Sequence, residues 1–150
     1  MKKLFLLLTI VFGFLSCEGP MGPEGPKGPP GEGTGWKIKY MTVYERNWEK
    51  IQSGKETYYR AIIEDKDLTQ YIYDEGALTV HQILDFDTQD EVQTALPYVF
   101  HRVDDDGYEW TETLYYDYRP GTIAFYLTFS DGIPRNPVIC DFKVTMLWPQ

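Results

Sequence analysis

Cysteine and histidine, which supply many catalytic and metal-binding groups, are scarce in this chain of 150 residues. It contains two cysteines, Cys17 and Cys140, and two histidines, His81 and His101. A zinc site needs three or four ligands at suitable spacing, and neither histidine lies in a metal-binding motif. We therefore expect both histidines to be ordinary surface residues and predict no metal site.

Other signals of catalysis are also missing. Beyond Ser16 the serines are Ser53 and Ser130, which lie next to turns and outside any nucleophile elbow. No glycine-rich phosphate-binding loop occurs. We predict no catalytic residue, no cofactor and no enzymatic activity.

Positive charge is in short supply as well. The chain has 14 Lys and Arg residues against 23 Asp and Glu residues, a net charge of −9. Loss of Lys2 and Lys3 with a leader would make this about −11, from 12 basic and 23 acidic residues. Such a chain repels phosphate backbones and anionic head groups, so we expect no nucleic-acid partner.

The longest apolar run is too short to span a bilayer. It extends from Leu4 to Leu15, follows two lysines and ends before Ser16 and Cys17. Twelve residues at about 1.5 Å each reach roughly 18 Å, whereas the hydrocarbon core is about 30 Å thick. This layout is typical of a secretory signal peptide, here residues 1–16.

The end of this leader favours lipid attachment over ordinary cleavage. Phe14-Leu15-Ser16-Cys17 resembles a bacterial lipobox, in which the cysteine thiol receives a diacylglyceryl group, although leucine is usual where Phe14 stands. Two or three acyl chains of the palmitate type would anchor the chain stably, whereas one would not. We therefore predict lipidation at Cys17; the alternative is an incidental cysteine after an ordinary signal.

Residues 17–35 form a glycine- and proline-rich segment. Glycine recurs at every third position, and proline follows it in a collagen-like register: Gly19, Gly22, Gly25, Gly28 and Gly31. Proline favours the extended polyproline II form, so we expect a semi-rigid linker. Only glycine fits the axis of a triple helix, which keeps a homotrimer open as the alternative to a monomer.

Residues 36–150 have the composition of one β domain. Glycine becomes sparse, and runs rich in aromatic and β-branched residues lie between turn signals. These runs predict a single antiparallel β-sandwich of about seven strands: 36–45, 58–65, 77–84, 94–103, 110–118, 122–130 and 138–148. One short crossover helix is expected at 67–76, capped by Asp67 and ended by Gly76 in a left-handed conformation.

Period-two patterns indicate which faces are buried. Ile123, Phe125, Leu127 and Phe129 lie on one face of their strand, opposite a wet face that includes Ala124 and Tyr126. Cys140 falls on the apolar face of the last strand, which accounts for its lone thiol as a small buried group. In 36–45, the apolar residues Trp36, Ile38 and Tyr40 alternate with lysines, and one side should face the core.

The candidate acids each have a simpler interpretation. Glu112, between Trp110 and Leu114 on one strand face, is more readily a hydrogen-bonded or edge glutamate than a catalytic acid. The run 104–107 (Asp-Asp-Asp-Gly) lacks the alternate spacing of a calcium loop and predicts a solvated turn. Paired carboxylates of glycoside hydrolases leave no fixed spacing in sequence, so a carboxylate-based glycan hydrolase remains an alternative.

Tyrosine admits two interpretations. A group of five tyrosines on two strands offers flat rings with polar tips that would suit stacking against sugars or peptides: Tyr58, Tyr59, Tyr115, Tyr116 and Tyr118. Aromatic residues on strand faces more often pack against neighbouring strands.

Several features together resemble a family of small lipoproteins of Bacteroidetes, in which a short collagen-like stretch precedes a compact β domain. They are Cys17-Glu18-Gly19-Pro20, the Gly-Pro triplets, Trp36 at the start of the domain, the crossover at 67–76, the segment 94–98, and Phe142-Lys143-Val144. The resemblance implies a lipid anchor in a Gram-negative outer membrane. It implies no activity, and Cys17 is the only functional position it supplies.

The sequence thus predicts a lipid-anchored cell-envelope protein that acts as a non-enzymatic structural or ligand-binding module. Its partners would be the membrane, through the lipid on Cys17, and an unidentified glycan or protein ligand. A collagen-like trimeric adhesin is the main alternative.

Overall fold

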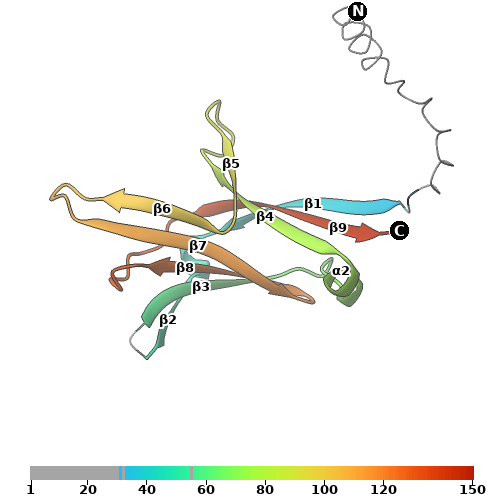
Figure 1. The fold of residues 1–150 in the computed structure, drawn as a ribbon, viewed down its shortest axis with the longest axis horizontal. Coiled ribbons are helices and arrows are strands. Elements are labelled where there is room, and N and C mark those ends of the chain that lie inside the picture. The colour runs from blue at the N-terminus through green and yellow to red at the C-terminus, as the bar shows by residue number, and fades with distance from the viewer. Residues whose placement is uncertain (1–30, 32, 55) are drawn as a thin grey trace, which may run out of the picture. The chain divides into compact units, whose positions relative to one another are not determined.

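A computed structural model describes residues 31, 33–54 and 56–150 (Figure 1). The predicted signal peptide, Cys17 and nearly all of the collagen-like segment lie outside the described residues. Glu32–Gln150 is one compact unit. Its first strand begins at Thr34, two residues before the predicted start of the domain.

The described chain folds into two antiparallel sheets and one short α-helix (Figure 1). The four-stranded sheet has the order β1 (Thr34–Val43), β9 (Cys140–Pro149), β4 (Ala77–Leu84) and β5 (Val92–Ala95). The five-stranded sheet has the order β2 (Glu49–Ser53), β3 (Glu56–Glu64), β8 (Thr122–Phe129), β7 (Glu109–Arg119) and β6 (Tyr98–Val103). A 3₁₀ turn, η1 (Glu45–Asn47), joins β1 to β2, and helix α2 (Gln70–Glu75) joins β3 to β4.

The prediction of about seven strands was too low, because the described residues form nine. Strand β2 is a short strand at the edge of its sheet, and its polar residues Lys50 and Gln52 give it the composition of a turn. The predicted strand 94–103 is two strands in different sheets, β5 and β6, separated by the cis Leu96–Pro97 peptide. Proline has no N–H for a ladder, so the chain leaves one sheet here and enters the other.

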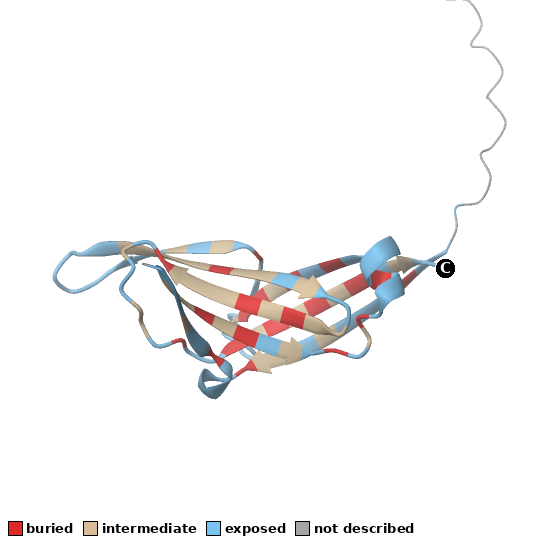
Figure 2. Cartoon of the chain, turned by 90° about the horizontal axis from the view of Figure 1, so that it is seen from below, coloured by how far each residue is buried: buried red, intermediate tan, exposed pale blue. Residues whose placement is uncertain are grey.

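The core lies between the two sheets, and buried residues alternate with more exposed ones along the strands (Figure 2). Ile123, Phe125 and Phe129 of β8 are buried, as the period-two pattern predicted. The rings of Phe125 and Phe142 stack across the sheets with centroids 4.1 Å apart. The predicted burial of Cys140 on the inner face of β9 is confirmed.

Strand β1 carries Lys37 and Lys39 on the same face as Met41 and Val43, which pack in the core, and its aromatic residues on the other face. Trp36, Ile38 and Tyr40 are 66%, 39% and 61% exposed and stand on the outer face of the four-stranded sheet. The opposite face carries Lys37 and Lys39. A strand pattern alone does not show which side is buried when both sides have long side chains.

Lys39 meets a buried acid on this face, while Lys37 stays exposed beside it. Asp65, at the end of β3, is 1% exposed, and its Oδ1 accepts hydrogen bonds from Lys39 Nζ at 2.5 Å and from the Asp67 N–H at 3.0 Å. Asp67 in turn pairs with Lys37 at 2.7 Å and with Lys39 at 3.0 Å. Burial opposes the charge on Lys39, but the hydrogen bonds to Asp65 and Asp67 outweigh it and raise the Lys39 pKa. Hydrogen bonds from both lysines lower the pKa of Asp67.

Helix α2 is shorter than predicted and is capped differently. Thr69, not Asp67, is the N-cap, and its hydroxyl accepts from the Ile72 N–H at 3.2 Å. The Asp67 carboxylate is instead paired with the two lysines of β1. Gly76 ends the helix in an extended conformation, φ −105°, and not the predicted left-handed one. Glycine is needed because a Cβ here would overlap the carbonyl oxygens of Leu147 and Ile72.

We predict that Lys39→Met lowers the free energy of unfolding by about 3 kcal/mol, because it leaves the buried Asp65 carboxylate without its cation. Lys37→Met is the matched control: its pair with Asp67 is exposed, so the loss should stay below about 1 kcal/mol. Urea unfolding of the two variants measures the difference. Equal losses would show that burial of Asp65 does not set the strength of this contact.

Candidate ligand-binding surface

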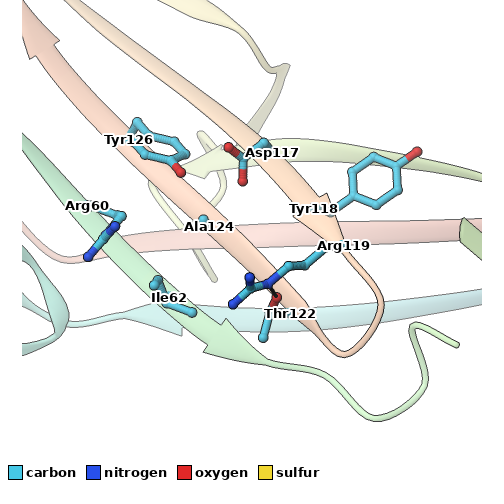
Figure 3. Close-up of a pocket in the computed structure, with 8 residues that line it drawn as sticks. All are labelled: Arg60, Ile62, Asp117, Tyr118, Arg119, Thr122, Ala124 and Tyr126. Atoms are coloured by element: carbon cyan, nitrogen blue, oxygen red, sulfur yellow. Dashed lines mark hydrogen bonds between the residues drawn. The ribbon is translucent and has the colours of Figure 1, made fainter. Parts of the chain in front are cut away.

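A hollow lies on the outer face of the five-stranded sheet, where three strands meet around a small residue (Figure 3). Ala124 on β8 lies between Ile62 of β3 and Asp117 of β7 in the strand register. Its methyl group leaves a space of about 400 Å³. Two residues further along β8, Tyr126 lies beside Arg60 of β3. Two residues back along β8, Thr122 lies beside Arg119 of β7.

Charged groups around the hollow are partly held by their neighbours. Arg60 Nη2 donates to Glu49 at 2.9 Å, which balances its charge, while its Nε–H has no acceptor in the part of the chain that the structure describes. Arg119 Nε donates to Thr122 Oγ1 at 3.1 Å (Figure 3). Partial burial and the Asp117 carboxylate raise the pKa of Tyr126, so its hydroxyl keeps its proton at neutral pH. The hollow therefore offers both donors and acceptors around an apolar floor.

The five predicted tyrosines do not form one platform. Tyr58 and Tyr115 lie on the outer face, where both pack against Tyr126. The Tyr115 and Tyr126 rings stack with centroids 5.0 Å apart and planes at 11°. One face of each ring is therefore covered by the other ring. The outer-face tyrosines therefore present edges and hydroxyl groups beside the hollow, which fits cross-strand packing better than an open platform.

The other three tyrosines face inward. Tyr59 is buried, and Tyr116 donates to the Leu78 carbonyl oxygen at 3.1 Å in the opposite sheet. Tyr118 packs edge to face against Tyr73, next to helix α2. Tyr116 thus helps to join the two sheets, and Tyr118 joins β7 to helix α2 while also lining the end of the hollow.

Glu112 is a hydrogen-bonded glutamate on the inner face of β7. Its Oε1 accepts from Trp110 Nε1 at 3.2 Å and its Oε2 from Arg102 Nε at 3.1 Å. The Trp110 ring is in turn covered by the Arg135 guanidinium, 3.8 Å from the ring centroid. Both carboxylate oxygens of Glu112 are engaged, and the Arg135 guanidinium occupies one face of the Trp110 ring.

The remaining candidates lie in loops or on surfaces. Asp104 Oδ1 accepts from the N–H groups of Asp106 and Tyr108 in an exposed turn, as predicted for 104–107. His101 is exposed, and His81 is half-buried on β4. Over the described ranges no three His, Cys, Asp or Glu side chains are grouped so as to hold a metal ion.

Comparison with known proteins adds no relative. No protein-family model matches the chain, and neither a curated protein nor a solved structure is significantly similar to it. The structure itself defines the class as an all-β domain of two antiparallel sheets. Within the described residues, no helix combines the length and apolar character needed to cross a bilayer.

Sequence reasoning found the right face but not the hollow. The alternation in 122–130 placed Ala124 and Tyr126 on the wet side of the strand, and the structure confirms this. Arg60, Asp117 and Arg119 were missed because their proximity depends on the order β3, β8, β7 in the sheet. A small residue between bulky neighbours on a wet face is the one signal that the sequence held.

We predict that Cys140, the free cysteine of the described domain, reacts slowly while the protein is folded. Burial raises the pKa of its thiol from 9.0 to about 11. Since the thiolate is the reactive form, alkylation by iodoacetamide at pH 8 should be roughly 100-fold slower in residues 31–150 than in the same chain in guanidinium. Mass spectrometry over time measures both rates. Similar rates would contradict the burial of this thiol.

Proposed function

We propose that this chain is a lipid-anchored protein of the bacterial cell envelope whose β domain binds a ligand without catalysing a reaction. The proposed cellular location is supported by three features of the sequence: an apolar leader too short to span a membrane, a lipobox-like segment ending at Cys17, and the resemblance to Bacteroidetes lipoproteins with a collagen-like stretch. The outer membrane is the proposed location. The glycine- and proline-rich linker would hold the domain away from the lipid surface.

The observation that carries the binding role is the hollow over Ala124. Asp117 supplies acceptors, Arg60 and Arg119 supply donors, and Tyr126 supplies a ring edge with a hydroxyl, all around one apolar floor. A pattern of donors, acceptors and apolar surface suits a hydroxyl-rich ligand such as a glycan.

Charge favours a neutral glycan over an acidic one. The chain carries a net charge of −9, and Arg60 is already paired with Glu49. Asp117 adds a negative charge inside the hollow. A polyanionic ligand would be repelled at long range by the whole domain, and within the hollow the Asp117 carboxylate offsets the positive charge of Arg119.

Binding is proposed in preference to hydrolysis because of Glu112. The acid that the sequence singled out has both of its oxygens in hydrogen bonds with side chains of the same domain. A trimeric adhesin remains the alternative for the linker, supported by the glycine period in residues 19–31.

We predict that Ala124→Tyr abolishes glycan binding, because the new ring fills the hollow. Tyrosine is favourable on a solvent-facing strand, so the fold should be kept. A glycan array of neutral and acidic envelope and host polysaccharides, probed with residues 31–150, measures binding. Thr79→Tyr, an equivalent change on the exposed face of β4, is the matched control and should bind as the unaltered domain does. Equal binding by both variants would place the ligand elsewhere, and no binding by the unaltered domain would remove the glycan proposal.

We also predict that Cys17→Ser releases the protein from the membrane fraction of its host, while Cys140→Ser leaves it there. Each buried methylene of an acyl chain contributes about 0.8 kcal/mol to anchoring, so loss of all chains should free the protein completely. Mass spectrometry of the mature N-terminal peptide provides the direct readout. An unmodified Cys17 thiol, or a retained leader, would overturn the proposed lipid anchor and membrane location.

A further inference from the structure

A second cavity lies between the two sheets, apart from the hollow over Ala124. It has a volume of about 250 Å³ and opens where β4 ends and β9 begins. Its apolar walls include Phe100 of β6, Leu114 of β7 and Leu127 of β8. The residues that line this inter-sheet cleft do not overlap those that line the hollow.

One buried polar group in the cleft lacks a partner. Gln82, on the inner face of β4, lines the cleft and is 8% exposed. Its Nε2 makes only a long contact, 3.9 Å, with the sulfur of Cys140, and its Oε1 accepts no hydrogen bond from any described residue. Nearly all buried polar groups in proteins are hydrogen-bonded, so an unpaired amide oxygen in a cavity wall calls for a donor from outside the chain.

The other polar groups of the cleft do not provide a buried, unpaired charge. Glu112 is paired with Arg102, and Asp141 accepts a hydrogen bond from Thr42 Oγ1 at 2.6 Å. Asp85 is exposed to solvent, and burial keeps the Cys140 thiol neutral by raising its pKa. A charged ligand would lose its hydration here without gaining a free counter-ion. The cleft therefore suits an uncharged molecule.

The rim of the cleft is apolar and exposed. Phe86 follows β4, and Val138 and Ile139 precede β9; all three line the cleft and are largely exposed to solvent. The connection between β8 and β9 that carries Val138 and Ile139 is held by Arg135, which pairs with Asp131 at 2.8 Å and covers the Trp110 ring. The mouth of the cleft is therefore apolar, and the segment that forms one side of it is fixed by Arg135. Small-molecule sites commonly have apolar walls.

We infer that the inter-sheet cleft binds a small uncharged molecule with an apolar body of about one ring and a hydroxyl or N–H group that donates to Gln82 Oε1. The size follows from the volume, since a cavity of about 150 Å³ already accepts benzene. The donor follows from the unpaired amide oxygen. The lack of charge follows because the charged lining residues are paired, hydrogen-bonded or exposed to solvent.

Phenol and toluene test this inference, because they share a ring and differ in the donor. The compact unit has its own core, so residues 31–150 can be titrated alone and followed by ¹H–¹⁵N NMR. We expect phenol to cause saturable shifts at Gln82, Leu114 and Leu127, with an affinity at least tenfold above that of toluene. Gln82→Leu should remove this preference and leave toluene binding intact. Gln52→Leu, the same change at an exposed position of β2, should retain it.

Three results would overturn the inference: no saturable binding of either probe, equal preference for phenol in Gln82→Leu, or shifts confined to the hollow over Ala124. Gln82→Met provides a second test should the leucine variant fail to fold. Ala124→Tyr should bind phenol as the unaltered domain does, so this site and the proposed glycan site can fail independently.

Discussion

The buried carboxylate of Asp65 is the constraint on which the arrangement of the two sheets depends. It needs a cation, and Lys39 of β1 supplies one at 2.5 Å. The Asp65 N–H donates to the Gly121 carbonyl oxygen at 2.8 Å, and the Gly121 N–H donates to that of Leu68 at 2.7 Å. One short segment thus joins the edge of the four-stranded sheet to the β7–β8 turn of the other sheet. The orientation of β1, with its aromatic residues outward, fits both this pairing and the packing of Met41 and Val43 in the core.

Both candidate sites arise where a residue differs from its surroundings in size or polarity. Ala124 is small on a face of tyrosines and arginines, which makes a hollow. Gln82 is polar on an inner face otherwise occupied by Leu78 and Val80, which leaves an amide oxygen unpaired. Neither change destroys the fold, because the strand ladders depend on backbone hydrogen bonds and the core on the remaining apolar side chains. Departures of this kind are where function is most often found.

Local patterns succeeded wherever one side of a strand was clearly apolar. The limits of β4, the alternation in β8 and the burial of Cys140 follow from residues adjacent in sequence. For β1 they predicted that one side faces the core but not which: Met41 and Val43 face it, and the aromatic residues stand outside. They failed at Leu96–Pro97, where one apparent strand serves two sheets. In both places the outcome depends on partners distant in the chain, Asp65 for β1 and the two separate sheets for β5 and β6.

By itself, the sequence determined the class of fold and the identity of the strongest inward-facing strands, because period-two burial and turn chemistry act over a few residues. The tertiary structure alone decided which residues from different strands meet. Arg60, Ala124 and Asp117 share a hollow, and Gln82, Glu112 and Cys140 share a cleft, only because of strand order and the approach of two sheets. Strand order is set by the burial of side chains far apart in the chain, and no local pattern encodes it.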